Sequence, residues 1–221
     1  MKTNSKKTII FDLDGTLYRF KGDSFKSSGL YDVIIENTLK YISIRLGKSE
    51  IEARGTLDFI VGKYGNSMSV GLEKEFKIDR YEYFDFAWKI DGKNYVEFNP
   101  DLKPFLIGLG DKFDLVLLSD APKVWIHKVL DYLEIREVFG SNVFSGESDT
   151  RKEFGNAFPE VCRALNIRAE DCIAVGDQEI TDIIPAKNIG MTTVFVGDTE
   201  SSVSNHTISN VLALEDILVE I

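Results

Sequence analysis

Residues 9–17 read Ile9-Ile10-Phe11-Asp12-Leu13-Asp14-Gly15-Thr16-Leu17, a short apolar strand that leads into two aspartates and a glycine. Because side chains alternate along a strand, Asp12 and Asp14 point to the same side and Leu13 points away. Gly15 gives the backbone the freedom to turn sharply at this point. Two carboxylates this close repel each other unless a cation or a shared proton lies between them. The segment therefore predicts a hard metal ion and an acid/base pair at the end of the first strand.

The same four residues, Asp-x-Asp-Gly, also occur in ordinary turns in which the acidic side chains cap the chain. For an isolated match that interpretation would be equally good. It is weaker here because three further groups of polar residues follow later strand-like runs.

Composition limits the classes of function. The 221 residues include 43% hydrophobic and 28% charged side chains, as in an ordinary globular protein. A net charge of −10 argues against binding a nucleic-acid polymer, which requires a basic face. A small phosphorylated substrate remains open, because one metal ion and one lysine can reverse the local field.

The sequence also bears on cellular location. Cys162 and Cys172 imply no disulfide framework and fit a reducing cytoplasm. The apolar stretch after Lys6 and Lys7 stops at Asp12, which is too short for a secretory signal. No apolar run reaches membrane-spanning length. We therefore expect a cytoplasmic protein, a monomer or homodimer, without a membrane partner.

Strand-like and helical patterns alternate through much of the chain. After the first strand, strands are expected at residues 113–118, 142–144, 172–175 and 192–196. Helices are expected at residues 122–133, 153–165 and 179–187, and from an Asn99 cap and Pro100 toward Leu109. This alternation predicts an α/β fold with a parallel sheet covered by helices on both faces.

The region from Arg19 to Glu97 differs, because it has no convincing strand and contains several helix starts. Ser49 with Glu52 forms a capping box, and Asp79 with Glu82 makes a similar start. Tyr31–Leu46 places apolar residues on one helical face. We predict an all-helical cap domain, residues 19–97, over the acidic strand tip. The α/β core domain would then comprise residues 1–18 and 98–221.

Polar residues recur where the predicted strands end. They are Ser119 with Asp120, Arg151 with Lys152 at the start of the helix after residues 142–144, and Asp177 with Thr181 and Asp182 in the loop that follows it. In an open parallel sheet, ligands bind beyond the carboxyl ends of the strands, so we expect these groups to meet Asp12 and Asp14 there.

Phosphoryl transfer suits this set of groups. A carboxylate can attack phosphorus and form an aspartyl phosphate. Mg²⁺ cancels the repulsion between the two anions and orients an oxygen. Ser119 and nearby amides can hold phosphate oxygens, and Lys152 adds a compact positive charge. Asp177 brings another hard oxygen ligand.

These residues resemble the motifs of the haloacid dehalogenase superfamily of phosphohydrolases over nearly the whole chain. The four motifs stand here as Asp12 to Thr16, Ser119, Lys152, and Gly176-Asp177 with Asp182. The stretch Ala186 to Met191 also resembles the usual continuation of the family. The resemblance implies a Rossmann-like, doubly wound core with an inserted helical cap, and a Mg²⁺ cofactor.

The resemblance also implies individual roles at the acidic positions. Asp12 would be the nucleophile and Asp14 the general acid and base. Asp12, the Asp14 backbone carbonyl and Asp177 would bind Mg²⁺, with Asp182 behind them. Dehalogenases and phosphonatases of the family lack the second aspartate, so Asp14 favours a phosphate ester, whose leaving group requires a proton.

Ser119, Asp120 and Lys152 are assigned to phosphate binding, with two departures from the family pattern. Many relatives carry Asn at the position of Asp120 and Pro at the position of Glu153. The carboxylate of Asp120 would repel phosphate, so it is expected to point away or to bind another group. Arg151 is expected to offset Glu153.

The helical insert further resembles the pyrimidine 5′-nucleotidase-like branch. The residues that carry this likeness are Leu17-Tyr18, Tyr64-Gly65 through Gly71-Leu72, Ile78-Asp79, Tyr83 and Asp91. An aromatic cluster in the insert comprises Tyr81, Tyr83, Phe84, Phe86 and Trp88. It either stacks on a nucleobase or forms the core of the lobe, and its helical spacing favours the second interpretation.

The expected function is a Mg²⁺-dependent phosphomonoesterase acting on a small phosphorylated metabolite, for which the branch resemblance suggests a nucleoside 5′-monophosphate. Hydrolysis of phosphoglycolate or a sugar phosphate by the same core is the alternative, with a β-phosphoglucomutase-like mutase further behind. A phosphate-binding regulator without turnover is the non-enzymatic alternative. Intact Asp12, Asp14, Lys152 and Asp177 count against the regulator.

Overall fold

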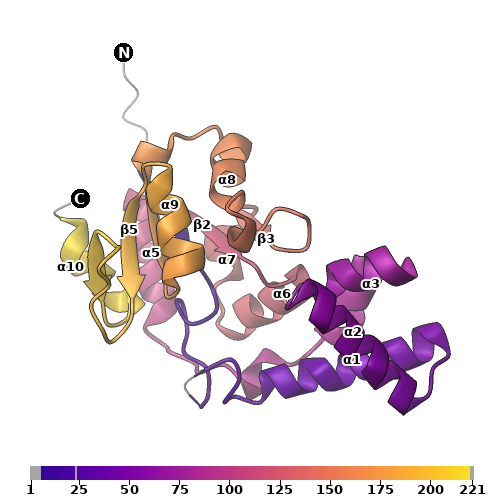
Figure 1. Ribbon diagram of the computed structural model, residues 1–221. Coiled ribbons are helices and arrows are strands. Elements are labelled where there is room, and N and C mark those ends of the chain that lie inside the picture. The colour runs from indigo at the N-terminus through magenta and orange to yellow at the C-terminus, as the bar shows by residue number, and fades with distance from the viewer. Residues whose placement is uncertain (1–5, 23, 220–221) are drawn as a thin grey trace.

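The protein is built around a six-stranded sheet in the order β3-β2-β1-β4-β5-β6, in which every neighbouring pair is parallel. The computed structural model, shown in Figure 1, describes residues 6–22 and 24–219. Residues 1–5, 23 and 220–221, which the predicted domain ranges include, lie outside the described part. The predicted doubly wound parallel sheet is confirmed.

The strands fall close to the predicted positions. They are β1 Thr8–Phe11, β2 Asp114–Ser119, β3 Val143–Ser145, β4 Cys172–Gly176, β5 Thr192–Val196 and β6 His206–Ile208. The edge strand β6 was not predicted, because a three-residue strand inside a polar stretch carries no apolar run to reveal it.

Helices and short helical turns connect the strands. The core helices are α5 Leu102–Lys112, α6 Lys123–Tyr132, α7 Arg136–Phe139, α8 Ala157–Leu165, α9 Ile184–Asn188 and α10 Leu214–Leu218. The 3₁₀ turns are Gly92–Asn94, Lys152–Phe154, Ala169–Asp171 and Val211–Ala213, and Glu179–Ile183 forms a π-helical turn. Among the described residues, no helix is at once long enough and apolar enough to cross a bilayer.

Two predicted helix starts were wrong. The helix expected from Pro100 begins at Leu102, because the Asn99 side chain accepts a hydrogen bond from the Asp101 amide and forms a turn. The helix expected from Glu153 is interrupted: a 3₁₀ turn ends at Gly155, whose φ of 72° is left-handed, and α8 starts at Ala157. Lys152 therefore lies on a short turn and not on a long helix.

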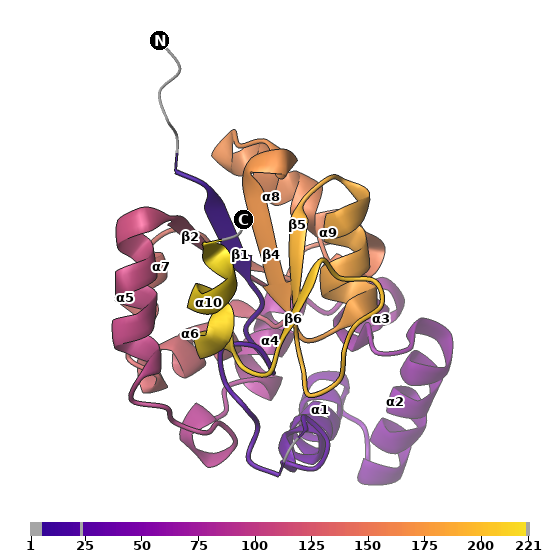
Figure 2. The same ribbon diagram turned by 90° about the vertical axis from the view of Figure 1, so that its left-hand side faces the viewer.

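Alternating side chains of the sheet build a separate apolar layer on each face. Phe11 and Leu117 face the layer that contains α5, α6, α7 and α10. Ile10 and Val116 face the opposite layer, with α8 and α9. Figure 2 shows these helices on the two sides of the sheet. Covering both faces leaves the carboxyl edge of the strands as the place for polar residues.

Four helices between β1 and β2 form a lobe beside that edge (Figure 1). They are α1 Leu30–Leu46, α2 Glu50–Tyr64, α3 Met68–Phe76 and α4 Arg80–Ala87. The predicted caps are confirmed: Ser49 and Glu52 form a capping box, and Asp79 accepts two amides at the start of α4.

The two segments that connect the lobe to the sheet run side by side. Phe20 and Val96 form an antiparallel bridge, and the Lys21 amide donates to the Tyr95 carbonyl at 2.8 Å. The lobe has its own apolar cluster, which includes Ile42, Leu57 and Tyr83. The exact boundaries of a cap domain at residues 19–97 stay a prediction.

The strand order places the end of β1 at the centre of the carboxyl edge. Phe11, the last residue of β1, pairs with Leu117 on one side and Val175 on the other. The order of strands reverses between β1 and β4, and open α/β sheets bind ligands at such a switch point. The residues that follow β1 thus enter the crevice between β2 and β4.

Candidate active site

The acidic tip after β1 is held in place by the neighbouring strand. The Asp12 amide donates to the Val175 carbonyl at 2.9 Å, and Leu13 is fully buried in the core, so the predicted alternation is observed. Gly15 has a φ of 94°, and a Cβ there would lie 2.3 Å from Oδ2 of Asp177. Glycine is therefore required both by the turn and by the approach of a carboxylate from β4.

Lys152 connects three elements at the centre of the site. Its Nζ lies 2.5 Å from Oδ1 of Asp12 and 2.6 Å from Oδ1 of Asp182, and all three residues are buried. Burial lowers the pKa of Lys152, but the charges of Asp12 and Asp182 outweigh it and hold that pKa well above its usual range. Lys152 is thus a permanently charged ammonium beside the Asp12 carboxylate.

Asp14 accepts hydrogen bonds on both oxygens. Oδ1 accepts from the Tyr18 hydroxyl and from the Trp125 indole Nε1 at 2.8 Å, and Oδ2 lies 3.2 Å from the Ser119 hydroxyl. Burial and the charge of Asp12 raise the pKa of Asp14, although the bonds from Tyr18 and Trp125 act in the opposite direction. The raised pKa of Asp14 favours its protonated form, which a general acid requires.

The proton of Asp14, when present, has a defined place. Oδ1 already accepts from an indole, which can only donate, and from Tyr18, whose pKa is raised well above its usual value by burial and by Asp14. The proton therefore belongs on Oδ2, on the side of Ser119.

Asp120 supports the backbone that carries Lys152. Its Oδ1 accepts the Lys152 amide at 2.8 Å, and its Oδ2 lies 3.4 Å from the Glu153 amide. Both oxygens are thus occupied by amides at the start of the 3₁₀ turn. Arg151 forms an ion pair with Glu153 at 3.2 Å. These contacts agree with the expectation that Asp120 binds a group other than substrate and that Arg151 offsets Glu153.

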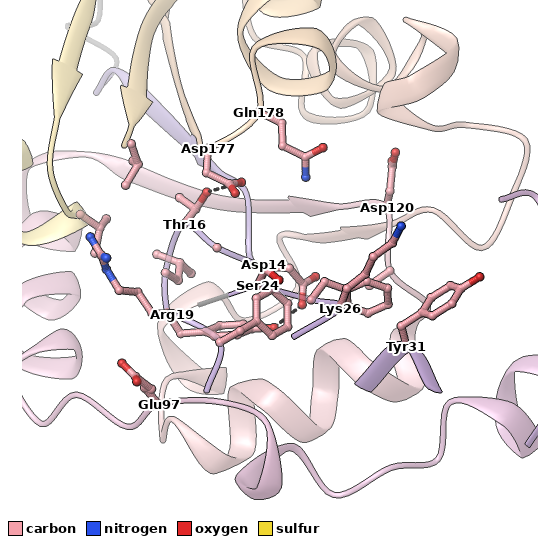
Figure 3. Close-up of a pocket in the computed structure, with 18 of the residues that line it drawn as sticks. Asp14, Thr16, Arg19, Ser24, Lys26, Tyr31, Glu97, Asp120, Asp177 and Gln178 are labelled. Carbon is pink, nitrogen blue, oxygen red and sulfur yellow. Dashed lines mark hydrogen bonds between the residues drawn. The ribbon is translucent and has the colours of Figure 1, made fainter. Parts of the chain in front are cut away.

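Asp177 and Asp182 enter from the end of β4. Thr16 donates to Oδ2 of Asp12 at 3.2 Å and lies 3.4 Å from Oδ1 of Asp177, as the dashed line in Figure 3 shows for the second contact. The Gln178 amide donates to Oδ2 of Asp182 at 3.0 Å, so this carboxylate is fixed at both ends. A Cβ on Gly176 would lie 2.4 Å from Asp182, which explains the glycine.

The acidic group has the chemistry of a divalent cation site. Oxygens of Asp12, Asp177 and Asp182 lie within 4.8 Å of one another. Burial, followed by the charges of Asp12 and Asp182, raises the pKa of Asp177, and the charge of Lys152 acts in the opposite direction. Carboxylate oxygens are the ligands that Mg²⁺ prefers, so the residues fit such an ion.

A cleft of about 1370 Å³ lies between this edge of the sheet and the lobe. Asp14, Asp120 and Asp177 line it from the sheet, and Lys26 and Trp88 are among the lobe residues that line it. Figure 3 shows Lys26 next to Asp14, with Tyr31 beyond it, among the residues that line this cleft. A small molecule can therefore contact the acidic tip and the lobe at once.

Two members of the aromatic cluster are buried in the lobe, whereas Tyr81 and Phe86 are exposed. Tyr83 is only 1% exposed and its hydroxyl lies 3.0 Å from that of Thr38, so it is not free to stack on a ligand. Phe84 is buried as well. Trp88 lines the cleft but stacks on Phe25, with an interplanar angle of 15°. The preferred interpretation, an aromatic lobe core, is confirmed for Tyr83 and Phe84.

The structure brings together Asp12, Asp14, Ser119, Lys152, Asp177 and Asp182, with Asp120 directly behind the Lys152 turn. Sequence reasoning gave no role to three residues that contact this group: Thr16, Tyr18 and Trp125. Thr16 ends the first motif and Tyr18 follows two residues later, and their spacing from the aspartates could have identified both. Trp125 lies 111 residues from Asp14, and nothing local to its helix indicates the contact.

A model of the haloacid dehalogenase-like hydrolase family matches residues 6–190. The chain belongs to this family. The resemblance seen in the sequence motifs is confirmed.

Individual relatives of this haloacid dehalogenase-like hydrolase cover most of its length. It is 35% identical over 202 residues to a glyceraldehyde 3-phosphate phosphatase of Pyrococcus furiosus, covering 86% of this chain and 80% of that one. It is 27% identical over 238 residues to an N-acylneuraminate-9-phosphatase of Rattus norvegicus, with coverage of 97% and 94%. Among solved structures, a HAD phosphatase from Thermococcus onnurineus shares the fold with a TM-score of 0.64, 22% identity and coverage of 96% and 97%.

Proposed function

We propose that this protein is a Mg²⁺-dependent phosphomonoesterase that hydrolyses a small phosphorylated metabolite through an aspartyl-phosphate intermediate. Membership of a hydrolase family, together with relatives that are phosphatases, supports hydrolysis of phosphoric monoesters. The observation that carries the mechanism is the buried contact of Lys152 with Asp12 at the end of β1.

In the first step, the carboxylate of Asp12 attacks phosphorus, an O–P bond forms, and the bond to the leaving oxygen breaks. Lys152 holds Oδ1 of Asp12 and Thr16 bonds Oδ2, so the carboxylate has a fixed orientation. Orientation of this kind removes much of the entropic part of the barrier.

The leaving oxygen requires a proton, which we assign to Oδ2 of Asp14. If Asp14 donates its proton toward Ser119 in the resting state, the Ser119 hydroxyl hydrogen is free to bind a phosphoryl oxygen. The Ala121 amide donates to the same Ser119 oxygen at 3.1 Å and fixes it. In the second step, Asp14 as carboxylate takes a proton from water, which attacks phosphorus and releases phosphate from Asp12.

Lys152 also has capacity for the substrate. An ammonium has three hydrogens, and Asp12 and Asp182 account for two of them. The third is available to a phosphoryl oxygen. Asp12, Asp177 and the Asp14 carbonyl would hold Mg²⁺, with Asp182 beside them, and the ion would supply the positive charge that lets two anions meet.

The substrate we propose is a small phosphorylated metabolite such as a sugar phosphate. The named relatives act on phosphorylated metabolites of that kind. A nucleoside 5′-monophosphate stays a prediction of the sequence motifs. Tyr83, Phe84 and Trp88 all line the cleft, and of these three Trp88 is the one that is not buried, so it is the candidate for base stacking.

A phosphate-release assay with a generic ester, with and without Mg²⁺, tests the proposal. Asp12→Asn should lower turnover by at least about a thousandfold, because the amide is a poor nucleophile of nearly the same shape. Asp114→Asn is a matched control, since this exposed aspartate lies at the opposite end of the neighbouring strand β2. Wild-type rates in Asp12→Asn would overturn the mechanism, and absence of any turnover would favour a phosphate-binding regulator.

A panel of phosphorylated metabolites then identifies the substrate class. Hydrolysis of sugar phosphates well above nucleotides supports the proposal, and the reverse order supports the nucleotidase prediction. Formation of an isomeric sugar phosphate without release of phosphate would indicate a mutase.

A further inference from the structure

The segment between β3 and the Lys152 turn, residues 146–151, is bonded to the lobe as well as to the sheet. It contains neither helix nor strand. On the sheet side, Asn156 accepts the Arg151 amide at 2.9 Å, and Asp120 accepts the Lys152 amide. Figure 1 shows the loop after β3 reaching toward α3 of the lobe.

Arg80, at the start of α4, makes the first contact between the lobe and the segment 146–151. Its NH1 lies 2.8 Å from Oδ1 of Asp149 and 3.4 Å from the Glu147 carbonyl. The other side of the same guanidinium pairs with Glu73 inside the lobe. Arg80 is only 8% exposed, so its charge is taken out of water and depends on these partners.

Arg151 makes the second contact between the two parts, from the core segment to the lobe. It belongs to the core segment, but its NH2 donates to the buried Ser69 hydroxyl at 3.2 Å, and its NH1 lies 3.5 Å from the Ser67 hydroxyl. Ser67 also donates to Glu153 at 3.1 Å. Lys152 is therefore flanked on both sides by residues that hold the start of α3.

We propose that Arg80 and Arg151 are positioning residues that fasten the lobe to the segment carrying Lys152. We call their contacts with Asp149, Ser67 and Ser69 the clasp. The clasp makes the observed position of the lobe and the placement of Lys152 at Asp12 favour each other. This inference rests on the proposed function only in that Lys152 binds the phosphoryl group.

The physical reason is the cost of breaking these contacts. Moving the lobe away would replace the bond of Arg151 to Ser69 and the ion pair of Arg80 with Asp149 by contacts with water, and these largely buried donors bond more strongly in place than in water. Coupling free energy is reciprocal, so a phosphate that orders Lys152 must also stabilise the observed position of the lobe. The position of the lobe would thus respond to the phosphoryl group itself, whatever the rest of the substrate.

Two double variants test the clasp. Ser69→Ala with Asp149→Asn removes one hydroxyl and one charge that span the lobe and the core. Ser43→Ala with Glu75→Gln is the matched control, because Ser43 bonds the Lys48 carbonyl and Glu75 pairs with Lys63, both within the lobe and away from Arg80. Melting temperatures of both variants show that they fold.

Inorganic phosphate is the probe. The spanning variant should bind phosphate about tenfold more weakly than wild type. The ion pair of Arg80 with the exposed Asp149 contributes little to this loss, whereas the hydrogen bond of the charged Arg151 to Ser69 corresponds to roughly tenfold in affinity. The control should remain within about twofold of wild type. Bound phosphate should slow the hydrogen exchange of the backbone amides in α3 and α4 in the wild type and the control, but not in the spanning variant.

The clasp can fail independently of the proposed function. Without phosphate, residues 146–151 should exchange faster in the spanning variant than in the control, and this measurement requires no activity. Equal exchange and equal phosphate affinity in the two double variants would overturn the clasp even in an active phosphatase. If wild type neither binds phosphate nor turns over, the proposed function fails, and the exchange of residues 146–151 still decides the clasp.

Discussion

Replacing Trp125 by Phe should separate proton donation by Asp14 from the rest of the reaction. Trp125 is fully buried on α6, and its indole gives Asp14 one of the two hydrogen bonds on Oδ1. Phenylalanine keeps an aromatic ring in the core but has no donor. Asp14 then keeps Tyr18 on Oδ1 and Ser119 at Oδ2, but it loses the donor from α6 that helps to fix the orientation of its carboxyl group.

The magnitude follows from the lost contact. A hydrogen bond to an ionised group contributes about 1.5–3 kcal/mol, which corresponds to roughly ten- to hundredfold in rate if the orientation of Asp14 depends on it. Because the bond from Trp125 lowers the pKa of Asp14, its removal should raise that pKa further. The first step needs protonated Asp14, so the pH at which the phosphorylation rate falls on the alkaline side should move to a higher value.

The assay compares single-turnover phosphorylation by an alkyl and an aryl phosphate. The alkyl ester, whose leaving group needs the proton, should slow by ten- to hundredfold, and the aryl ester by no more than about threefold. Leu130→Ala on the same helix is the control for a cavity in the core, because Leu130 is buried in the same apolar cluster. Equal losses for both esters, or the same pattern in Leu130→Ala, would refute the reasoning.

Further predictions concern the metal, the Lys152 turn and the lobe. The raised pKa values of Asp177 and Asp182 mean that the metal-free fold retains protons that the unfolded chain has lost, so thermal melts should show stability falling as pH rises from about 4 through neutrality. Mg²⁺ should therefore raise the melting temperature more at pH 8 than at pH 5, and an equal rise would contradict the site. Asp120→Ala should lower kcat/KM about tenfold, because an unsatisfied backbone amide at Lys152 costs about 1–3 kcal/mol. Asp120→Asn keeps an acceptor for that amide and should keep most of the activity. Similar losses in both variants would show that the carboxylate itself matters. Trp88→Ala should weaken nucleotide hydrolysis by about 1–3 kcal/mol relative to a small ester if a base stacks there, and parallel losses with a lower melting temperature would assign Trp88 to the lobe core.

The central part of the site could be predicted because short stretches of consecutive residues reveal where each strand ends. An apolar run followed by Asp12 or Asp177 marks a strand end, and parallel strands end at one edge of the sheet. Strand alternation fixed the directions of Asp12, Leu13 and Asp14. Two helix starts were predicted wrongly, because Asn99 and Gly155 redirect the chain through turns that compete with helix starts.

The sequence by itself determined the fold class, the central strand positions and the meeting of the aspartates with Lys152, since all of these follow from periodicity and strand ends. Only the tertiary structure decided what surrounds them. The donors on Asp14 include Trp125 from α6, Asp120 supports the Lys152 turn, and Arg80 reaches Asp149 across 69 residues. Such contacts depend on how helices distant in the chain pack against the sheet, and local residue patterns do not encode that packing.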